Sequence, residues 1–478
     1  MQLSQDQTKA VERIQSFFHD RDGPRMLALA GAAGTGKTTV IGNLVSHANL
    51  PRQIRFTATT NKAAGVAASM TNGQECPTVH KVFGLAPVRT YNGTGSVLKE
   101  KNKPKYDEGD IILVDESSMV DDAMFNILMR RAKESDLKLL FIGDPYQLPP
   151  VTEDVEKADE VPPVFRLAPT VSLTKVHRQA ADSPILSLAT EVRQAVDGAP
   201  FPTIASVNGS IKVFEHGKPA SRSALNEMLK EMLACQQASN DHNYLRMLAW
   251  TNRQVNELNA VARRVIHGKD AARYPFLPGE RVMSNKALFL PKRREPTEAS
   301  ADPFEDIGLP EDDKTLVIAP DRWLEVVSAT PETKQHSAAH VRGTTLTVRN
   351  EEDNEYTFFV PGDWKAAKIV LGSYAGRAAK LARERRANPH KVSGAEVYDA
   401  WQAYYDLEDR YADIRAPYAS TIHKSQGSTY KHSVIWMNDV AYARSVSMKM
   451  FARLMYVAIT RASESVSFSD PLPKGLVG

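Results

Sequence analysis

One short loop near the N-terminus carries the clearest chemistry in this sequence. Residues 31–38 read Gly-Ala-Ala-Gly-Thr-Gly-Lys-Thr and match the phosphate-loop pattern G-x-x-x-x-G-K-[ST] at every fixed position. Glycines let backbone N–H groups curl around phosphate oxygens, Lys37 can reach the β- and γ-phosphates, and Thr38 can hold Mg²⁺ through its hydroxyl. The pattern therefore predicts a site for ATP and Mg²⁺. The residues expected to bind them here are Gly34, Thr35, Gly36, Lys37, Thr38 and Thr39.

Two adjacent carboxylates supply the second half of the predicted site. Asp115 and Glu116 follow the apolar run 111–114, the arrangement of a strand that ends in a Walker B pair. Asp115 can orient Mg²⁺ through its water shell, and Glu116 can polarise the attacking water. Thr38 and Asp115 are therefore the expected metal residues.

Three further side chains suit the transfer of a γ-phosphoryl group. Gln147 follows a strand-like run and can both donate to a phosphate oxygen and accept from water. Arg178 and Arg461 offer planar, bidentate guanidinium groups, which best stabilise the charge that shifts in the transition state. The expected catalytic residues are Lys37, Asp115, Glu116, Gln147, Arg178 and Arg461.

These side chains need elements that bring them to one edge of a sheet. In the first part of the chain, apolar runs alternate with helical segments, which predicts a parallel sheet with phosphate chemistry at the carboxyl ends of its strands. A second α/β region begins near Val171 and closes late, with a strand-like run at 433–437 and a last helix. The strands expected in the first sheet are residues 26–30, 54–58, 111–114 and 137–142.

The first α/β region is interrupted at residues 87–109, which predicts a small insertion. Asn92-Gly93 is a strong turn signal, so the segment is interpreted as a β-hairpin. Its lysines alternate along the chain, which suits either a contact with nucleic acid or an edge strand protected by charge. These lysines are Lys99, Lys101, Lys103 and Lys105.

The second α/β region is interrupted from about Gly279. Short β-like runs, such as 344–349 and 356–360, give way to a helical stretch at 366–413, which predicts a β-rich insertion with a helical extension. One helix in that stretch carries many cations, a pattern more typical of a solvated helix face than of a DNA-contact face. The cations are Arg377, Lys380, Arg383, Arg385 and Arg386.

Composition limits the remaining possibilities. With 478 residues, 42% hydrophobic and 24% charged, the chain has the make-up of a soluble protein of several domains. The net charge of +3 is a weak signal, because a basic channel can coexist with an acidic surface. Cys76 and Cys235 form no C-x-x-C pair, which argues against a structural zinc site. No apolar run could span a bilayer and no signal-peptide layout is present, so a cytoplasmic location is expected.

Taken in order along the chain, the motifs resemble those of superfamily 1 helicases, and within them the RecD/Dda-like 5′→3′ class (superfamily 1B). The Asp-Glu-Ser-Ser-Met sequence at 115–119 and the Thr-Ile-His-Lys-Ser-Gln-Gly sequence at 421–427 favour this class over the branch of opposite polarity. The matching segments are 3–7, 31–38, 57–64, 78–85, 115–119, 143–150, Arg178, 418–429 and 456–462, and the modest length suits a compact, Dda-sized helicase.

The resemblance implies a fold and two further nucleotide contacts. The fold is α/β, with two RecA-like P-loop NTPase domains, a small β-hairpin insertion in the first and an SH3-like plus helical insertion in the second. Gln7 is the implied adenine reader, and Gly427 is an implied nucleotide neighbour. The expected boundaries are 1–86 with 110–170 for the first domain, 87–109 for its insertion, 171–279 with 415–478 for the second domain, and 280–414 for its insertion.

Contacts with nucleic acid are expected from side chains that bond phosphates or stack on bases without reading sequence. Hydroxyl and amide groups just past a strand can bond backbone phosphates. His80 and Phe83 could stack on bases, although ordinary core packing explains Phe83 equally well. The expected contact residues are Thr59, Thr60, Asn61, His80, Phe83, Thr251, Asn252, Thr421, His423, Lys424 and Gln426.

The resemblance implies an ATP-dependent DNA helicase that moves 5′→3′ along single-stranded DNA and unwinds duplex in replication, recombination or repair. Polarity follows from the resemblance and not from residue chemistry. Single-stranded and forked DNA are the expected substrates of a monomer in a bacterial or phage-infected cytoplasm, and a single-strand-binding protein or replisome components are further candidate partners. The alternatives are a translocase that mainly displaces proteins, and an ATP-switched DNA-binding or loading factor. Phosphate contacts do not discriminate DNA from RNA.

Overall fold

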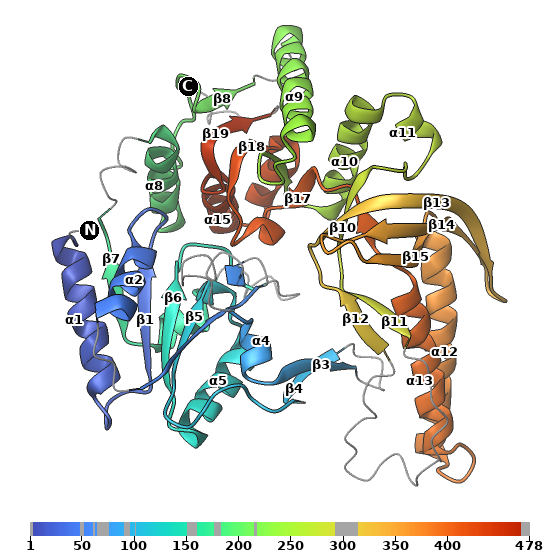
Figure 1. Ribbon diagram of the computed structural model, residues 1–478, viewed down its shortest axis with the longest axis horizontal. Helices are drawn as coiled ribbons and strands as arrows, with labels where there is room; N and C mark the ends of the chain where they lie inside the picture. The colour runs from blue at the N-terminus through green and yellow to red at the C-terminus, as the bar shows by residue number, and fades with distance from the viewer. Residues whose placement is uncertain are drawn as a thin grey trace. The chain divides into compact units, whose positions relative to one another are not determined.

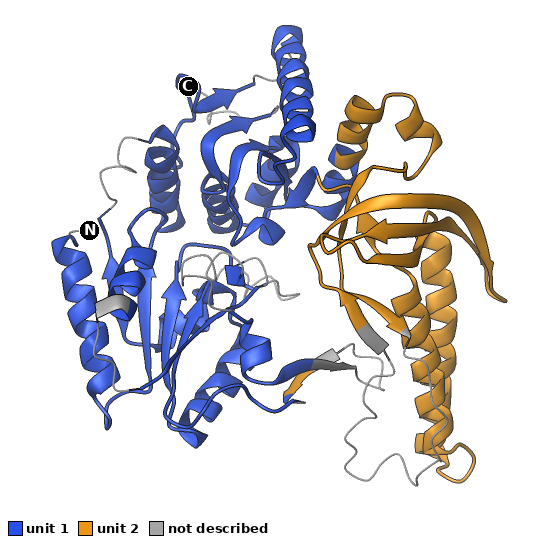
Figure 2. Ribbon diagram, in the orientation of Figure 1, with its two compact units in different colours: residues 1–86, 100–258, 418–478 blue, residues 87–99, 259–417 orange. Residues whose placement is uncertain are grey.

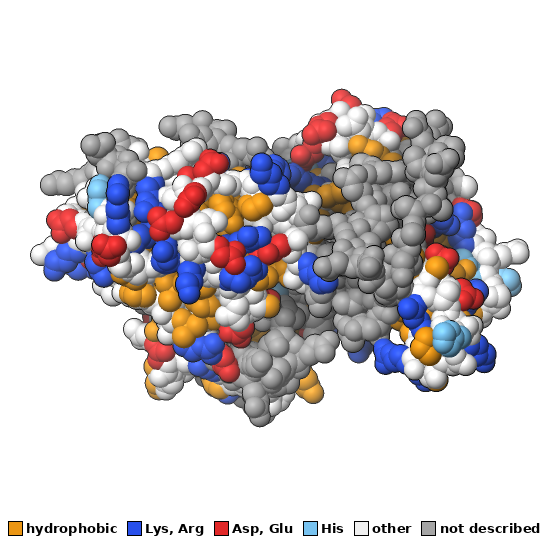
Figure 3. Space-filling view, turned by 90° about the horizontal axis from the view of Figure 1, so that it is seen from below, with side chains coloured by type: hydrophobic (Ala, Val, Ile, Leu, Met, Phe, Trp, Pro, Cys, Tyr) orange, Lys and Arg blue, Asp and Glu red, His pale blue; other side chains and the backbone are white. Residues whose placement is uncertain are grey.

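The computed structural model describes residues 3–47, 52–60, 63–64, 76–89, 96–100, 102–150, 160–175, 183–214, 218–291 and 314–469. Two compact units divide the chain (Figure 2). Unit 1 comprises residues 1–86, 100–258 and 418–478, and unit 2 comprises residues 87–99 and 259–417. Cationic and anionic side chains are interspersed on the face shown in Figure 3, as the small net charge implies. No helix in the described ranges is long and apolar enough to cross a bilayer.

The first sheet of unit 1 is parallel and has the order β2-β5-β6-β1-β7 (Figure 1). Its central strands are continuous apolar runs with no polar alternation, because helices cover both faces of such a sheet. The strands are β1 (Met26–Gly31), β2 (Ile54–Ala58), β5 (Ile111–Asp115), β6 (Lys138–Gly143) and β7 (Thr170–Leu173), and the accompanying helices are α1 (Gln5–His19), α2 (Lys37–His47), α4 (Val79–Val82), α5 (Asp122–Glu134) and α6 (Pro163–Leu167).

The predicted start of the second α/β region at Val171 is wrong. Val171 lies in β7, which pairs in parallel with β1 and completes the edge of the first sheet. A short edge strand with one or two apolar residues has no pattern of its own, so sequence cannot tell which sheet it joins.

The second sheet of unit 1 is also parallel, with the order β17-β9-β18-β19-β8. Together the two sheets confirm the predicted α/β class with two parallel sheets. Helix α15 is almost entirely buried and packs against α8 in the core of this half. The strands are β8 (Ile211–Val213), β9 (Leu245–Ala249), β17 (Ala419–Thr421), β18 (Tyr430–Ile435) and β19 (Ala462–Phe468), and the helices are α8 (Pro184–Val196), α9 (Pro219–Ser239), α14 (Met437–Val440) and α15 (Met448–Ile459). Helix α10 (Asn252–His267) begins in unit 1 and ends in unit 2.

Unit 2 is built on an antiparallel sheet with the order β15-β14-β13-β10-β16. Two long helices, α12 (Trp364–Ala387) and α13 (Gly394–Arg410), follow the sheet and pack side by side (Figure 1). In unit 2, β-rich structure therefore precedes the two helices, and the SH3-like character of the insertion stays a prediction. The strands of this sheet are β10 (Arg281–Ser284), β13 (Trp323–Gln335), β14 (His340–Arg349), β15 (Glu355–Pro361) and β16 (Ile414–Arg415). β11 (Leu288–Pro291) and β12 (Lys314–Ile318) form a separate two-stranded sheet, and α11 spans Asp270–Arg273.

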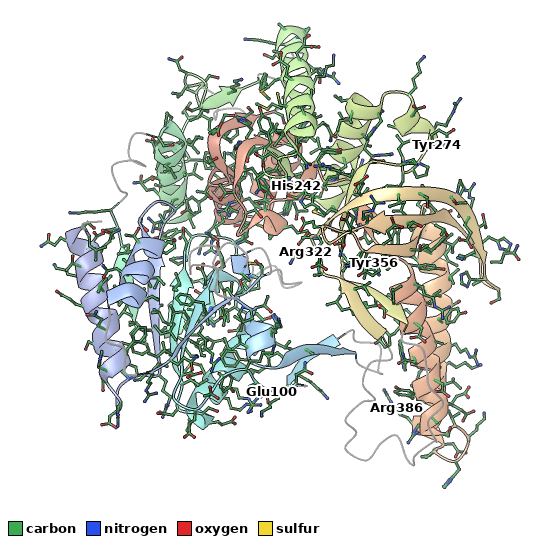
Figure 4. All side chains as sticks on the ribbon, viewed as in Figure 1. Glu100, His242, Tyr274, Arg322, Tyr356 and Arg386 are labelled. Atoms are coloured by element: carbon green, nitrogen blue, oxygen red, sulfur yellow. The ribbon has the colours of Figure 1, made fainter. Side chains whose placement is uncertain are left out.

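The predicted hairpin corresponds to a two-stranded sheet of β3 (Leu85–Arg89) and β4 (Ser96–Glu100). The base of the hairpin is held by Glu100, whose carboxylate pairs with Arg130 and Arg131 of α5 (Figure 4). Gly84 enters it with φ 66°, and a Cβ there would lie 2.1 Å from the Asn102 carbonyl oxygen, so only glycine fits. The Asn92-Gly93 turn and Lys101 lie outside the described residues.

Candidate active site

The phosphate loop joins β1 to α2, as the sequence predicts. Gly34 and Gly36 have φ values of 78° and 82°, a region that glycine adopts without strain, and this lets successive N–H groups face one point. The Lys37 ammonium donates to the carbonyl oxygens of Gly31 at 2.7 Å and Ala32 at 3.1 Å, so its charge lies inside the loop. Thr38 is exposed at the start of α2. The loop therefore offers N–H groups, a cation and a hydroxyl together.

Gln7 lies against this loop, although the two are 28 positions apart in the chain. The first turn of α1 is a capping box in which the Ser4 N–H donates to Gln7 Oε1 at 3.0 Å. Gln7 Nε2 donates to the Thr35 carbonyl oxygen at 3.3 Å, and the Gln7 side chain is only 2% exposed. The capping box thus fixes an amide group beside the phosphate loop.

Asp115 ends β5 at the carboxyl edge of the first sheet, and Glu116 follows it directly. Glu116 has φ 50°, a left-handed conformation that is uncommon for a residue other than glycine and is often found at functional sites. Burial and the charge of Asp115 raise the pKa of Glu116 to about 6, while Arg461 and Lys37 act in the opposite direction. Burial also raises the pKa of Asp115, opposed by the N–H of Glu116 and by Lys37. Lys37 therefore acts on both carboxylates, and Arg461 acts on Glu116.

Arg461 comes from the second sheet and yet acts on Glu116 of the first. It follows α15 and is only 6% exposed. Its guanidinium donates to the carbonyl oxygens of Val457 at 3.2 Å and Ser428 at 3.1 Å, and to Thr460 Oγ1 at 3.2 Å. These bonds hold the charge in place. The other predicted arginine, Arg178, lies outside the described residues.

Gln147 lies in the segment that follows β6 and is 7% exposed. Its side-chain oxygen is buried and accepts no hydrogen bond from the described part of the chain. A buried amide oxygen without a donor is costly, so a donor is expected from outside these residues, such as a water. The role of Gln147 in sensing the γ-phosphate stays a prediction.

Asp144 and Tyr456 form a link that sequence reasoning missed. The Tyr456 hydroxyl donates to Asp144 Oδ2, and the backbone N–H of Ala33 in the phosphate loop donates to the same hydroxyl at 3.4 Å. Burial and the Asp144 charge raise the pKa of Tyr456 well above its usual range, so the hydroxyl keeps its proton. Both residues lie inside segments that the sequence had singled out, 143–150 and 456–462, but no spacing rule pairs them. The Tyr456 hydroxyl thus joins α15 to the phosphate loop and to the segment that follows β6.

We expect Tyr456→Phe to destabilise the fold by about 1–3 kcal/mol, because the buried Asp144 carboxylate loses its hydroxyl donor. The measurement is the urea midpoint of unfolding. Tyr146→Phe is the matched control: its hydroxyl donates to the exposed Asp197 at 2.6 Å, so its loss costs only about 0.5 kcal/mol. If the two variants lowered the urea midpoint equally, the Tyr456–Asp144 hydrogen bond would contribute no more to stability than the exposed Tyr146–Asp197 bond.

The loop after β17 carries the motif that contains Gly427. Gly427 has φ 71°, and a Cβ there would lie 3.3 Å from the Ala63 Cβ, so this glycine permits close approach to the segment that follows β2. Gln426 Nε2 donates to the Leu148 carbonyl oxygen at 3.0 Å. Gln426 was predicted to contact nucleic acid, but here its amide bonds the segment after β6. Gln426 therefore links the loop after β17 to the segment after β6.

Other predicted contact residues in the second half are held by local bonds. Thr421 Oγ1 accepts from the Lys424 N–H at 3.2 Å, which fixes the turn. Burial lowers the pKa of His423 to about 4, so its ring is neutral at pH 7. Thr251 bonds Asp439 through both its N–H at 2.7 Å and its hydroxyl at 2.8 Å. Asn252 is exposed at the start of α10, and its predicted contact with nucleic acid stays a prediction.

The predicted contacts in the first half divide into three groups. Thr59 donates from its hydroxyl to the Glu116 carbonyl oxygen at 3.1 Å, so it is tied to the active site. Thr60 Oγ1 accepts from the Ala63 N–H at 3.1 Å, a local bond within the segment that follows β2. His80 is half-buried, and burial lowers its pKa. Asn61 lies outside the described residues.

Base stacking by Phe83 is a prediction that the structure contradicts. The Phe83 ring is 0% exposed and packs on Tyr106 with 5.1 Å between ring centroids. The residue ends the short helix α4, whose apolar side faces the core. A single aromatic residue in sequence does not show which side of its element is buried, so only packing could decide.

The donor set fits Mg²⁺ better than a metal that needs a full protein cage. No group of three or more His, Cys, Asp or Glu that could hold a metal occurs among the described residues. Mg²⁺ commonly keeps several waters and takes one or two protein oxygens together with substrate phosphates. The exposed Thr38 hydroxyl and the Asp115 carboxylate match that requirement.

Comparison with known proteins places these features in a family. Residues 2–212 match the model described as an AAA domain, and residues 417–468 match the UvrD-like helicase C-terminal domain. The chain is 25% identical over 474 residues to the ATP-dependent DNA helicase dda of Enterobacteria phage T4, covering 98% of this chain and 99% of that protein. It is 32% identical over 191 residues to the ATP-dependent RecD2 DNA helicase of Deinococcus radiodurans, covering 39% of this chain and 23% of that protein.

Among solved structures, the crystal structure of Pif1 helicase from Candida albicans aligns with 16% identity and a TM-score of 0.45, covering 100% of this chain and 97% of that one. The relatives in sequence span both halves of the active site described above, the phosphate loop with its carboxylates and the segment that carries Arg461. The chain is therefore a relative of the superfamily 1B helicases Dda, RecD2 and Pif1.

Proposed function

We propose that this protein is an ATP-dependent DNA helicase that moves 5′→3′ along single-stranded DNA and unwinds the duplex ahead of it. One observation carries the proposal. Lys37 beside the first sheet and Arg461 beside the second both lower the pKa of Glu116, which supports a single nucleotide site that draws on both sheets. A site of this kind can couple hydrolysis to the relative motion of the two sheets, which a pure binding switch does not need.

The nucleotide site is proposed to work through residues of both sheets. The loop N–H groups and Lys37 would hold the phosphates of ATP, while Thr38 and Asp115 would hold Mg²⁺; the metal supplies positive charge at the phosphates. Glu116 would accept a proton from the attacking water. Arg461 would stabilise charge on the oxygens of the transferred group.

ATP hydrolysis is proposed to be coupled to movement along the DNA strand through the contacts that join the two halves of unit 1. Tyr456 bonds Asp144 and Ala33, and Gln426 bonds Leu148. A change at the phosphate loop would alter these bonds and thereby shift the second sheet. Residues such as Asn252 and Lys424 would then grip the strand in alternation with Thr60 and His80, through phosphate contacts that do not depend on sequence.

We expect ATP turnover to rise as the pH increases through about 6. The pKa of Glu116 is raised to about 6, so below that pH the carboxyl group holds its proton and cannot accept another. Turnover is measured with saturating single-stranded DNA between about pH 5 and about pH 8, a range that brackets the pKa of Glu116. Glu116→Gln should reduce turnover about 10²–10⁴-fold and remove this limb of the profile.

The same substitution has an opposite expected effect on stability. Because folding raises the pKa of Glu116, the carboxylate is disfavoured in the folded chain, and stability falls as the pH rises from the unfolded value of 4.5 through about 6. Glu116→Gln removes that buried charge and should raise the thermal midpoint at pH 7. A variant that loses both activity and stability would show that Glu116 is structural.

The β3–β4 hairpin is proposed to act as the wedge at the duplex junction. Deleting residues 91–103 should impair unwinding far more than hydrolysis stimulated by single strands, because the nucleotide site lies elsewhere in the chain. Both activities are measured on the same preparation. An equal loss of unwinding and of hydrolysis stimulated by single strands would contradict the proposal that the hairpin is a wedge.

The deciding experiment compares forked DNA with a 5′ tail, a 3′ tail or both. Strand separation only from substrates with a 5′ tail is the expected result, and separation only from 3′ tails would overturn the polarity. Displacement of a bound protein without strand separation would favour the translocase alternative. Both halves of the proposed nucleotide site come from one chain, which supports a monomer. The proposed location is the cytoplasm, and a single-strand-binding protein or replisome components are proposed as further partners.

A further inference from the structure

Helix α12 in unit 2 carries a concentration of positive charge that the proposed motor does not use. The helix has a single acidic residue, Glu384. Its partner α13 has the opposite balance, with one basic residue, Arg410. The cations of α12 are Lys365, Lys368, Arg377, Lys380, Arg383, Arg385 and Arg386.

Most of these cations lie on one side of α12. The opposite side packs into unit 2 through Ala367, Val370 and Ala378. Lys365 and Arg383 are 18 positions apart, which is about five helical turns, so they point in the same direction. The same relation holds for Lys368 and Arg386, and Arg386 lies toward the end of α12 that is remote from the sheet of unit 2 (Figure 4).

The exposed cations on this face have few anionic partners. Lys365, Lys368, Arg383 and Arg386 make no ion pair within the described ranges, and Lys380 approaches Glu384 only to 3.9 Å. Elsewhere in the structure, cations such as Arg55 and Arg131 do have close carboxylates. The face therefore keeps its positive charge available over a length of about 30 Å.

Two glycines give the middle of this face a low profile. Gly372 and Gly376 lie between the cationic ends, and a Cβ at either position would meet nothing within 4 Å. Glycine inside a helix costs about 1 kcal/mol relative to alanine, so neither packing nor backbone conformation accounts for them. A partner that approaches the helix backbone closely would account for both.

We propose that this face of α12, from Lys365 to Arg386, binds the phosphate backbone of double-stranded nucleic acid. Charge complementarity favours a polyanion, and a straight, rigid row of cations suits a rigid duplex. Proteins that hold single strands stack bases on aromatic side chains. On α12 the exposed aromatic residue is Trp364 at its first position, and the exposed residues from Lys365 to Arg386 include none. The sequence pattern favoured a solvated face. The shared direction of the cations favours a contact, as does the absence of an ion pair at Lys365, Lys368, Arg383 and Arg386 among the residues that the structure describes.

The test measures binding of the full chain, without nucleotide, to a fluorescent blunt duplex and to a single strand of equal length. The triple variant Lys380→Gln, Arg383→Gln, Arg386→Gln should weaken duplex binding about tenfold or more and leave single-strand binding within about twofold. Its plot of log affinity against log salt should flatten by about 2–3, since each phosphate contact contributes about 0.9 to the slope.

The matched control removes the same charge from another helix and its end: Lys9→Gln, Arg13→Gln, Arg21→Gln, all exposed on or just after α1. It should leave duplex binding unchanged. Equal weakening by both triples would show a general charge effect and overturn the proposal, as would duplex binding that neither triple alters. A loss confined to an acidic polypeptide probe, such as polyglutamate, would assign the face to an acidic protein.

A second variant keeps the charge and tests the close approach. Gly372→Leu with Gly376→Leu adds bulk at two exposed positions of a helix, where leucine is favourable, so folding should be retained or improved. Duplex binding should fall severalfold, and unchanged binding would contradict the close approach. Because these assays need no ATP, failed hydrolysis by the wild-type chain would sink the proposed motor while leaving the duplex surface to be judged separately.

Discussion

Replacing Lys37 with alanine should reduce ATP turnover at least about 10²–10³-fold while single-strand binding stays within about threefold. Lys37 supplies the cation of the phosphate loop, and its ammonium lies against the Gly31 and Ala32 carbonyl oxygens. Removing it takes away the charge that would meet the β- and γ-phosphates. The strand-contact residues lie on other loops and should keep their affinity. Steady-state hydrolysis and fluorescence anisotropy on one preparation measure the two effects.

Lys9→Ala is the control for this result, because Lys9 is an exposed lysine of α1 outside the loop. It should hydrolyse ATP as the wild type does. Wild-type turnover by Lys37→Ala would remove the phosphate loop as the ATP site, and the proposed function would fall with it.

Arg461→Ala should leave nucleotide affinity nearly intact and reduce turnover about 10³–10⁵-fold, the range reported for arginines that stabilise charge in phosphoryl transfer. The guanidinium acts electrostatically on Glu116 although the two residues come from different sheets. Arg461→Lys keeps the charge but loses the planar fork, so it should recover only part of the rate. Binding of a fluorescent nucleotide and single-turnover hydrolysis separate affinity from chemistry.

The pH profile gives Arg461 a second, independent readout. Arg461 holds the pKa of Glu116 down, so its removal should move the midpoint of the profile above about 6. Thr460→Val is the matched control: it removes an acceptor of the guanidinium but keeps the charge, and should change turnover only slightly. If Arg461→Ala hydrolysed ATP normally with an unshifted profile, the coupling between the two sheets would lose its basis.

Local motifs could be predicted from sequence because their function depends on contiguous residues. The spacing of Gly34, Gly36 and Lys37 specifies a loop conformation before a helix, and Asp115-Glu116 after an apolar strand specifies a carboxyl edge. The same holds for the order of the two α/β regions, since hydrophobic runs alternate with helices along the chain. These features came from backbone preferences and short-range pattern, and the structure agrees with them.

Tertiary structure decided which side chains meet and which are buried. Phe83 could have been a stacking platform or a core residue, and packing against Tyr106 made it a core residue. Tyr456 and Asp144 are 312 positions apart, so no sequence period relates them, and only the packing of α15 beside the first sheet brings them together. Sequence by itself determined the phosphate chemistry of this protein, because that chemistry resides in contiguous residues; the tertiary fold alone decided the linkage between the two sheets, because such contacts depend on how distant elements pack.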